Sequence, residues 1–178
     1  AAVLSGALGR TAGENAGLYD FTVGTANAGA NYVIALSPTA GQFSIDRKAI
    51  SFSVANSSSV FGTVAVPGAV TFNGLLPNDV VAGTIVVRNA QNQAITLAAG
   101  TGVGGFGVSL SGLTGAAAGN YVLATSGNTP GVLTINKATL NLVVANTSKE
   151  FGAPNPAFGF TATGFVAGDT AATLVGSS

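Results

Sequence analysis

The chain has 178 residues, of which six are Lys or Arg and six are Asp or Glu, so its formal net charge is zero. Charged residues make up 7% of the sequence, against about 25% in an average soluble domain. The absence of His and Cys excludes Ser-His-Asp and Cys-His nucleophiles and the ordinary zinc sites. With a net charge of zero, the chain lacks the excess of positive charge that nucleic-acid binding requires. We therefore predict that the protein is not an enzyme, needs no metal or cofactor, and binds no nucleic acid.

Apolar residues amount to 47% of the chain, but they are scattered among 26 Gly and many Ser, Thr and Asn. No apolar run approaches the roughly 18 residues that a membrane-spanning helix needs, so we predict a protein that does not span a membrane. The first residues carry neither a starting Met nor a basic and apolar leader. We expect the chain to be part of a longer protein, and its lack of Cys suits a bacterial chain exported unfolded.

Apolar and polar residues alternate with a period of two in several short runs, which are separated by Gly, Asn, Ser and Pro. This pattern predicts short antiparallel strands with one buried and one solvated face. Most of the ten Phe fall on the apolar positions and are expected in the core. In chain order, the predicted strands lie at residues 32–36, 43–45, 50–54, 121–123, 133–135, 140–144 and 158–160.

Two short segments favour a single helical turn, at residues 78–82 and 168–172. Asp79 and Asp169 stand where an N-cap would stand, because their side chains accept hydrogen bonds from the free N–H groups of a first turn. The two residues occupy equivalent places in the repeat described next. We therefore predict that both are structural turn caps and not catalytic carboxylates.

A repeat of about 90 residues runs through the sequence. When residues 45–79 are aligned with residues 135–169, ten of the 35 positions are identical, and residues 31–35 match residues 120–124 at a shift of 89. Self-similarity at a fixed period indicates a tandem array. The period predicts three parts: 1–46 as the C-terminal half of one repeat, 47–136 as a complete repeat, and 137–178 as the N-terminal half of the next.

Three stretches resemble the MBG repeats of large secreted bacterial adhesins, which are often exported by two-partner secretion. They are Lys149–Phe158, Thr163–Thr170 and Gly6–Tyr19, and the family usually has Tyr-Gly where this chain has Phe151–Gly152. The complete repeat lacks the Asn-Pro pair of the motif. The resemblance implies small β-grasp-like domains in an elongated array, at the bacterial cell surface or secreted, without active-site residues.

A few motifs have both a structural and a functional interpretation. Asn56 and Asn146 begin Asn-x-Ser/Thr sequons, which either accept a glycan or close a turn at the end of a strand. Gly100–Gly105 formally matches a phosphate-binding motif, but neither a helix nor a nearby acidic residue follows, so we predict a glycine-rich hairpin loop. Lys48 and Lys137 invite comparison with isopeptide-forming lysines, and we expect them instead at solvated strand ends.

The leading functional prediction is a non-catalytic structural module, a stalk or fibre of a bacterial extracellular adhesin or surface filament. The alternative is an adhesive module that recognises a glycan, a matrix polymer or a host protein through its loop tips. The expected partners are neighbouring repeats of the same protein. The complementary halves also suggest a head-to-tail homopolymer completed by strand addition, although the halves could instead close on each other within one chain.

Overall fold

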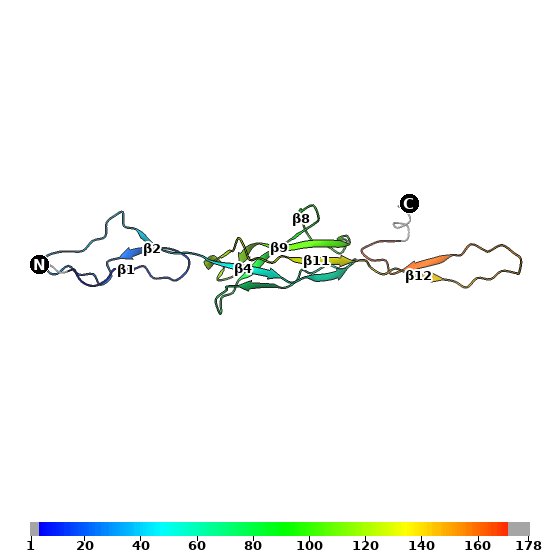
Figure 1. Ribbon diagram of the computed structural model, residues 1–178, viewed down its shortest axis with the longest axis horizontal. Helices are drawn as coiled ribbons and strands as arrows, with labels where there is room; N and C mark the ends of the chain where they lie inside the picture. Colours follow the sequence, from blue (N-terminus) through cyan, green and yellow to red (C-terminus); the bar gives the residue numbers. More distant parts are fainter. Residues whose placement is uncertain (1–3, 171–178) are drawn as a thin grey trace. The chain divides into compact units, whose positions relative to one another are not determined.

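The computed structural model describes residues 4–170 and is mainly β, as predicted (Figure 1). Its strands form four sheets. The chain packs as two compact units. Among the described residues, one unit gathers those up to Phe52 with Phe72–Thr84 and Ser111–Asn128, and the other gathers Ser53–Thr71, Ile85–Leu110 and those from Thr129 to residue 170.

The first sheet contains β1 (Gly9–Arg10), β2 (Gly17–Thr22) and β3 (Gln42–Ile45), in that order. Both pairings are antiparallel, with Gly17 opposite Ile45. The predicted strand at 43–45 is therefore confirmed. The predicted strand at 32–36 is wrong, because these residues form no strand and Tyr32 and Val33 are exposed.

Residues 48–136 supply the strands of two further sheets. One has the order β10-β4-β6, and the other has the order β5-β11-β9-β7-β8. The bounds are β4 (Lys48–Val54), β5 (Ser57–Val60), β6 (Val70–Asn73), β7 (Ala82–Arg88), β8 (Ala94–Ile95), β9 (Gly104–Thr114), β10 (Tyr121–Leu123) and β11 (Gly131–Asn136).

The expectation of purely antiparallel strands is wrong for these sheets. Strand β10 pairs with β4 in parallel, and β11 pairs with β5 in parallel. Parallel partners need a long crossover between them, and here about 70 residues separate the two members of each pair. Alternation of apolar and polar residues predicts that a segment is a strand, but not whether its partner runs parallel or antiparallel. The parallel pairings could therefore not be predicted from the sequence pattern.

The fourth sheet contains β12 (Asn141–Val144) and β13 (Phe160–Thr163), which pair in antiparallel. Strand β13 lies 90 residues after β6, and β12 lies within the segment 90 residues after β4. The sequence repeat is thus also a repeat of strand positions. The division of the chain at residues 46 and 136 stays a prediction.

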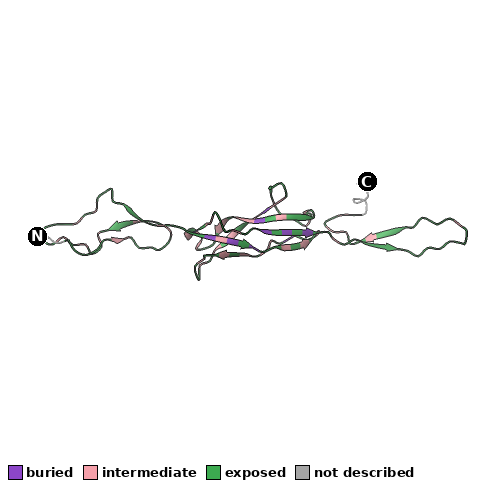
Figure 2. Cartoon of the chain, in the orientation of Figure 1, coloured by how far each residue is buried: buried purple, intermediate pink, exposed green. Residues whose placement is uncertain are grey.

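The buried hydrophobic residues of the described part of the chain all lie between Ile50 and Ile135. Figure 2 shows them as purple segments, most visibly on β4 and β11. They are Ile50, Phe52, Val54, Ala65, Val87, Val108, Tyr121, Leu133 and Ile135.

The expectation that most Phe are buried is wrong. Phe52 is the one Phe in the buried set. Several others are exposed: Phe21, Phe43, Phe151, Phe158 and Phe160.

The predicted helical turn at residues 78–82 is instead a β-turn. The Asp79 N–H donates to the Leu76 carbonyl at 3.3 Å, and Asn78 has a φ of 70°. Pro at the second and Asn at the third turn position are typical of a type II turn, where the third residue needs a positive φ. Strand β7 then begins at Ala82 and leaves no room for a helix.

A similar turn stands 90 residues later, where the Asp169 N–H donates to the Val166 carbonyl at 3.0 Å. The end of that predicted helical turn, residues 171–172, lies outside the described residues. The helical element of the described chain is a short 3-10 turn, Ala118–Asn120.

Candidate functional site

The most buried titratable side chain of the described residues is Tyr121, at the start of β10. The residue is 3% exposed, and its phenol donates a hydrogen bond to the Asp79 carboxylate. The Leu76 N–H donates to the same phenol oxygen at 3.2 Å. We call these three residues the tyrosine latch, because they fasten β10 to the β-turn that ends at Asp79.

The hydrogen bond to Asp79 raises the pKa of Tyr121 above its usual value of 10.0, and burial adds to that rise. Both effects favour the neutral phenol over the phenolate. The predicted site residue Asp79 is therefore one half of a side-chain pair. The role of Asp79 as a turn cap stays a prediction. The structure also shows its contact with Tyr121, which the sequence pattern did not indicate.

A small cleft of about 160 Å³ adjoins the latch, and its lining includes Glu14, Asp46 and Lys48. Within residues 4–170 no three carboxylates stand close enough to hold a metal ion. The polar contacts of Tyr121 are therefore two hydrogen bonds. Its hydroxyl donates one to the Asp79 carboxylate and accepts the other from the Leu76 N–H.

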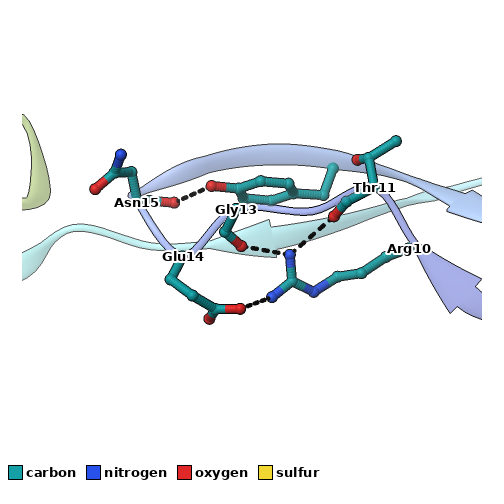
Figure 3. Close-up of polar contacts among 6 residues, drawn as sticks. Arg10, Thr11, Gly13, Glu14 and Asn15 are labelled. Carbon is teal, nitrogen blue, oxygen red and sulfur yellow. Dashed lines mark hydrogen bonds and ion pairs between the residues drawn. The ribbon is translucent and has the colours of Figure 1, made fainter.

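The loop between β1 and β2 is organised around one guanidinium group (Figure 3). Arg10 donates to the carbonyls of Thr11 and Gly13 and pairs with the Glu14 carboxylate at 2.5 Å. The guanidinium also lies 4.8 Å from the ring centroid of Tyr19, whose hydroxyl donates to the Asn15 carbonyl at 2.6 Å. We call this set of residues the arginine loop. Its polar contacts, and not a buried core, hold together the segment Gly6–Tyr19 that resembles MBG repeats.

Asn120, next to Tyr121, contacts the arginine loop. Its Oδ1 accepts a hydrogen bond from the Ala16 N–H at 2.8 Å, and its Nδ2 donates to Asn15 Oδ1 at 3.0 Å. Asn120 thus binds the preceding loop, and Tyr121 binds the turn at Asp79. In the sequence, this pair was visible only as the match between Asn31–Tyr32 and Asn120–Tyr121, which did not indicate these contacts.

The Phe-Gly pair of the complete repeat contacts the C-terminal segment. Gly62 has a φ of 97°, and a Cβ placed there would lie 2.4 Å from the Val166 Cβ. Glycine is needed at this position for both backbone conformation and space. Phe61, Leu140 and Asp169 belong with Val166 to the lining of an open apolar groove of about 250 Å³, the C-terminal groove.

The two sequon residues differ in their contacts. Asn56 Oδ1 accepts a hydrogen bond from the Val132 N–H at 2.8 Å, which joins segments 76 residues apart in place of the local turn contact that we expected. Asn146 is exposed. Glycosylation of either residue stays a prediction.

The remaining motifs are structural in the parts described. Gly100–Gly105 leads directly into β9 and not into a helix. It is a strand-to-strand loop as predicted, but not a hairpin, because β7 lies between β8 and β9 in the sheet. Lys48 and Lys137 are exposed, as expected for strand-end lysines.

The described residues are rich in β-strands, and some strand positions recur after 90 residues. In a comparison with protein families, residues 140–178 match the MBG domain (YGX type). This confirms the resemblance to MBG-type repeats, which usually occur in surface proteins.

No curated protein and no solved structure matches the chain. No helix among residues 4–170 has the length and apolar character required to cross a membrane.

Proposed function

We propose that the chain is a non-catalytic structural repeat module of a bacterial extracellular adhesin or surface filament, whose task is to set length and to present other parts of the protein. The observation that carries this proposal is the recurrence of strand positions: β13 stands 90 residues after β6, within a segment that matches the MBG domain. Modules of this kind contact their neighbours along the chain.

The contacts made by successive repeats support the same role. Asn120 holds the arginine loop that precedes the complete repeat, and Gly62 receives Val166 from the segment that follows it. The first site joins two side-chain amides and one backbone N–H, and the second places a valine side chain against a glycine. The buried Tyr121–Asp79 pair fastens a strand to a turn. These features fit a spacer better than a catalytic or ligand-binding site.

The test is a variant chain in which residues 47–136 are duplicated in frame. A spacer predicts that small-angle X-ray scattering shows a fixed gain in maximum dimension per added copy, with one more cooperative unfolding unit. The matched control carries a Gly-Ser insert of equal length, which gives no added unfolding unit. Saturable binding of the original chain to a glycan or matrix polymer would instead favour the adhesive module.

A further inference from the structure

Two segments of the complete repeat pair in parallel in each of the two compact units. In the first unit, β10 pairs with β4, with Tyr121 opposite Lys48. In the second unit, β11 pairs with β5, with Leu133 opposite Ser57. We call residues 48–61 and 121–136 the seam segments. The first seam segment begins the complete repeat, and the second one ends it.

The direction of this pairing decides how the complete repeat responds to tension along the chain. Such tension pulls residue 48 toward the N-terminus and residue 136 toward the C-terminus. Because the seam segments are parallel, the two pulls are opposed and act along the strands. The hydrogen bonds of a parallel pair are evenly spaced, so they share the tension and have to break together, in shear. In an antiparallel pair pulled at adjacent ends, the bonds instead break one after another.

In the first unit, hydrogen bonds continue the pairing past the end of β10. The Ala124 N–H donates to the Ile50 carbonyl at 2.9 Å. The Phe52 N–H donates to Asn128 Oδ1 at 3.1 Å, and Asn128 Nδ2 donates to the Ala124 carbonyl at 2.6 Å. The Asn128 side chain therefore binds both seam segments where β10 has already ended.

In the second unit, two more bonds join the seam segments before β5 and β11 pair. The Val54 N–H donates to the Thr129 carbonyl at 2.9 Å. The Val132 N–H donates to Asn56 Oδ1 at 2.8 Å, at a point where β4 has ended and β5 has not begun. The seam segments are thus bonded over a greater length than their paired strands.

Packing in the second unit opposes sliding of one seam segment along the other. Leu133 and Ile135 are 0% and 3% exposed, and a slip by one residue would turn both to the solvated face. A slip by two residues under tension would bring Thr129 to the place of Gly131. A Cβ at that place lies 2.8 Å from the Val54 carbonyl oxygen. The segments therefore have to separate before they can slide.

We propose that the complete repeat is a mechanical clamp, in which the seam segments resist tension along the chain by shear. This inference rests on the proposed structural role and deepens it, since tension of this kind arises in a stalk or fibre. The two are tested apart, because the duplication experiment measures length and the experiments below measure strength under tension. A repeat that yields at low force can still set length.

The first experiment is single-molecule force spectroscopy of the full chain with two pairs of attachment points. The chain contains no Cys, so introduced cysteines define where force is applied. Arg47→Cys with Lys137→Cys pulls the seam segments in shear. Val103→Cys with Lys137→Cys pulls β9 from β11, an antiparallel pair that has Gly104 opposite Ile135 and opens from that end. The three replaced side chains are exposed.

At equal loading rate, the shear pair is expected to rupture at a severalfold higher force than the peeling pair. Forced unfolding is governed by the unfolding barrier, and in shear that barrier includes many bonds at once. The length released in shear should correspond to the chain between residues 47 and 137, which identifies the event as the opening of the complete repeat. Equal forces for the two pairs, or a lower force in shear, would overturn the proposal.

The second experiment repeats both pulling geometries with two matched substitutions. Asn56→Ala removes a bond between the seam segments, so it is expected to lower the rupture force in shear and to leave the peeling force unchanged. Asn89→Ala is the control. The Asn89 side chain also accepts backbone N–H groups, from Gln91 at 3.1 Å and Gln93 at 2.9 Å, but in the turn after β7 and away from the seam segments.

Asn89→Ala is expected to leave the rupture force in shear unchanged. A substitution that merely loosened the fold would lower the force in both geometries. Equal losses for Asn56→Ala in shear and in peeling, or equal losses in shear for the two substitutions, would overturn the assignment of tension to the seam segments.

Discussion

The complete repeat and the C-terminal segment contain matching apolar residues in very different surroundings. Ile50, Phe52 and Val54 are at most 6% exposed. Their counterparts 90 residues later, Leu140, Leu142 and Val144, are 40–62% exposed. Apolar residues stand at the same three alternating positions in both segments, so we attribute the difference to the strands that cover them. The matching residues are buried only in the segment that other strands cover.

The N-terminal segment shows the same relation from the other side. Leu133 is 0% exposed in the complete repeat, and its counterpart Phe43 is 40% exposed. The segment is ordered instead by the arginine loop, whose contacts are hydrogen bonds, one ion pair and a guanidinium over aromatic rings. Polar contacts can organise a loop, but they do not replace an apolar core.

The largest difference is expected from truncating a core residue and its counterpart. Ile50→Ala should lower the free energy of unfolding of the complete repeat by about 2–5 kcal/mol, because it leaves a cavity in a packed core. Leu140→Ala should cost less than about 1 kcal/mol in dilute solution, because that side chain is already solvated. Denaturant unfolding measures both. Equal losses would contradict the comparison.

A matched pair of glycines gives the next effect. A Cβ at Gly131 would lie 2.8 Å from the Val54 carbonyl oxygen, whereas nothing lies within 4 Å of a Cβ at the counterpart Gly41. Gly131→Ala should therefore destabilise by about 1–3 kcal/mol. Gly41→Ala should be neutral or slightly stabilising, because it restricts the unfolded chain. Thermal unfolding of the two variants checks this, and a harmless Gly131→Ala would show that the strands can move apart.

The tyrosine latch gives a smaller effect with a pH signature. Tyr121→Phe should lower the stability of the complete repeat, since it leaves the Asp79 carboxylate and the Leu76 N–H without their partner. Tyr32→Phe should change nothing in dilute solution.

The folded pKa of Tyr121 is raised above 10.0, so its contribution is complete below about pH 10 and declines as the pH rises through the folded value. The stability difference between the original chain and Tyr121→Phe should shrink in that range. A difference independent of pH would exclude the phenol as its source.

The smallest effect is expected in the arginine loop. Glu14→Gln should change the global stability by less than about 0.5 kcal/mol, because Glu14 is 86% exposed and solvated ion pairs contribute little. Faster amide exchange confined to residues 11–16 is the expected readout. A loss as large as that of Tyr121→Phe would show that the loop is coupled to the complete repeat.

The sequence predicted the repeat, the β class and several strand positions, since alternation at 50–54 and 133–135 is a local signal. It did not reveal which strands would form at all. Tyr32–Ile34 alternates as well as Tyr121–Leu123, yet only the latter has a neighbouring strand to bind. Strand formation depends on distant hydrogen-bond partners, so the pattern alone overestimates it.

The candidate site was predicted in part. Asp79 and Asp169 were found because they recur at one position of the repeat. The bond between Asp79 and Tyr121 joins residues 42 positions apart, and no local pattern indicates it. The helical turn was predicted wrongly because the residues after Asp79 resemble a first helical turn. Asn78 instead adopts a positive φ, and β7 follows at once.

The central claim is that segments 50–54 and 140–144 differ in the strands that cover them, and amide hydrogen exchange by mass spectrometry tests it most directly. At high dilution, peptides covering residues 50–54 should be protected by several orders of magnitude more than peptides covering 140–144. Equal protection of the two segments at high dilution would contradict the account.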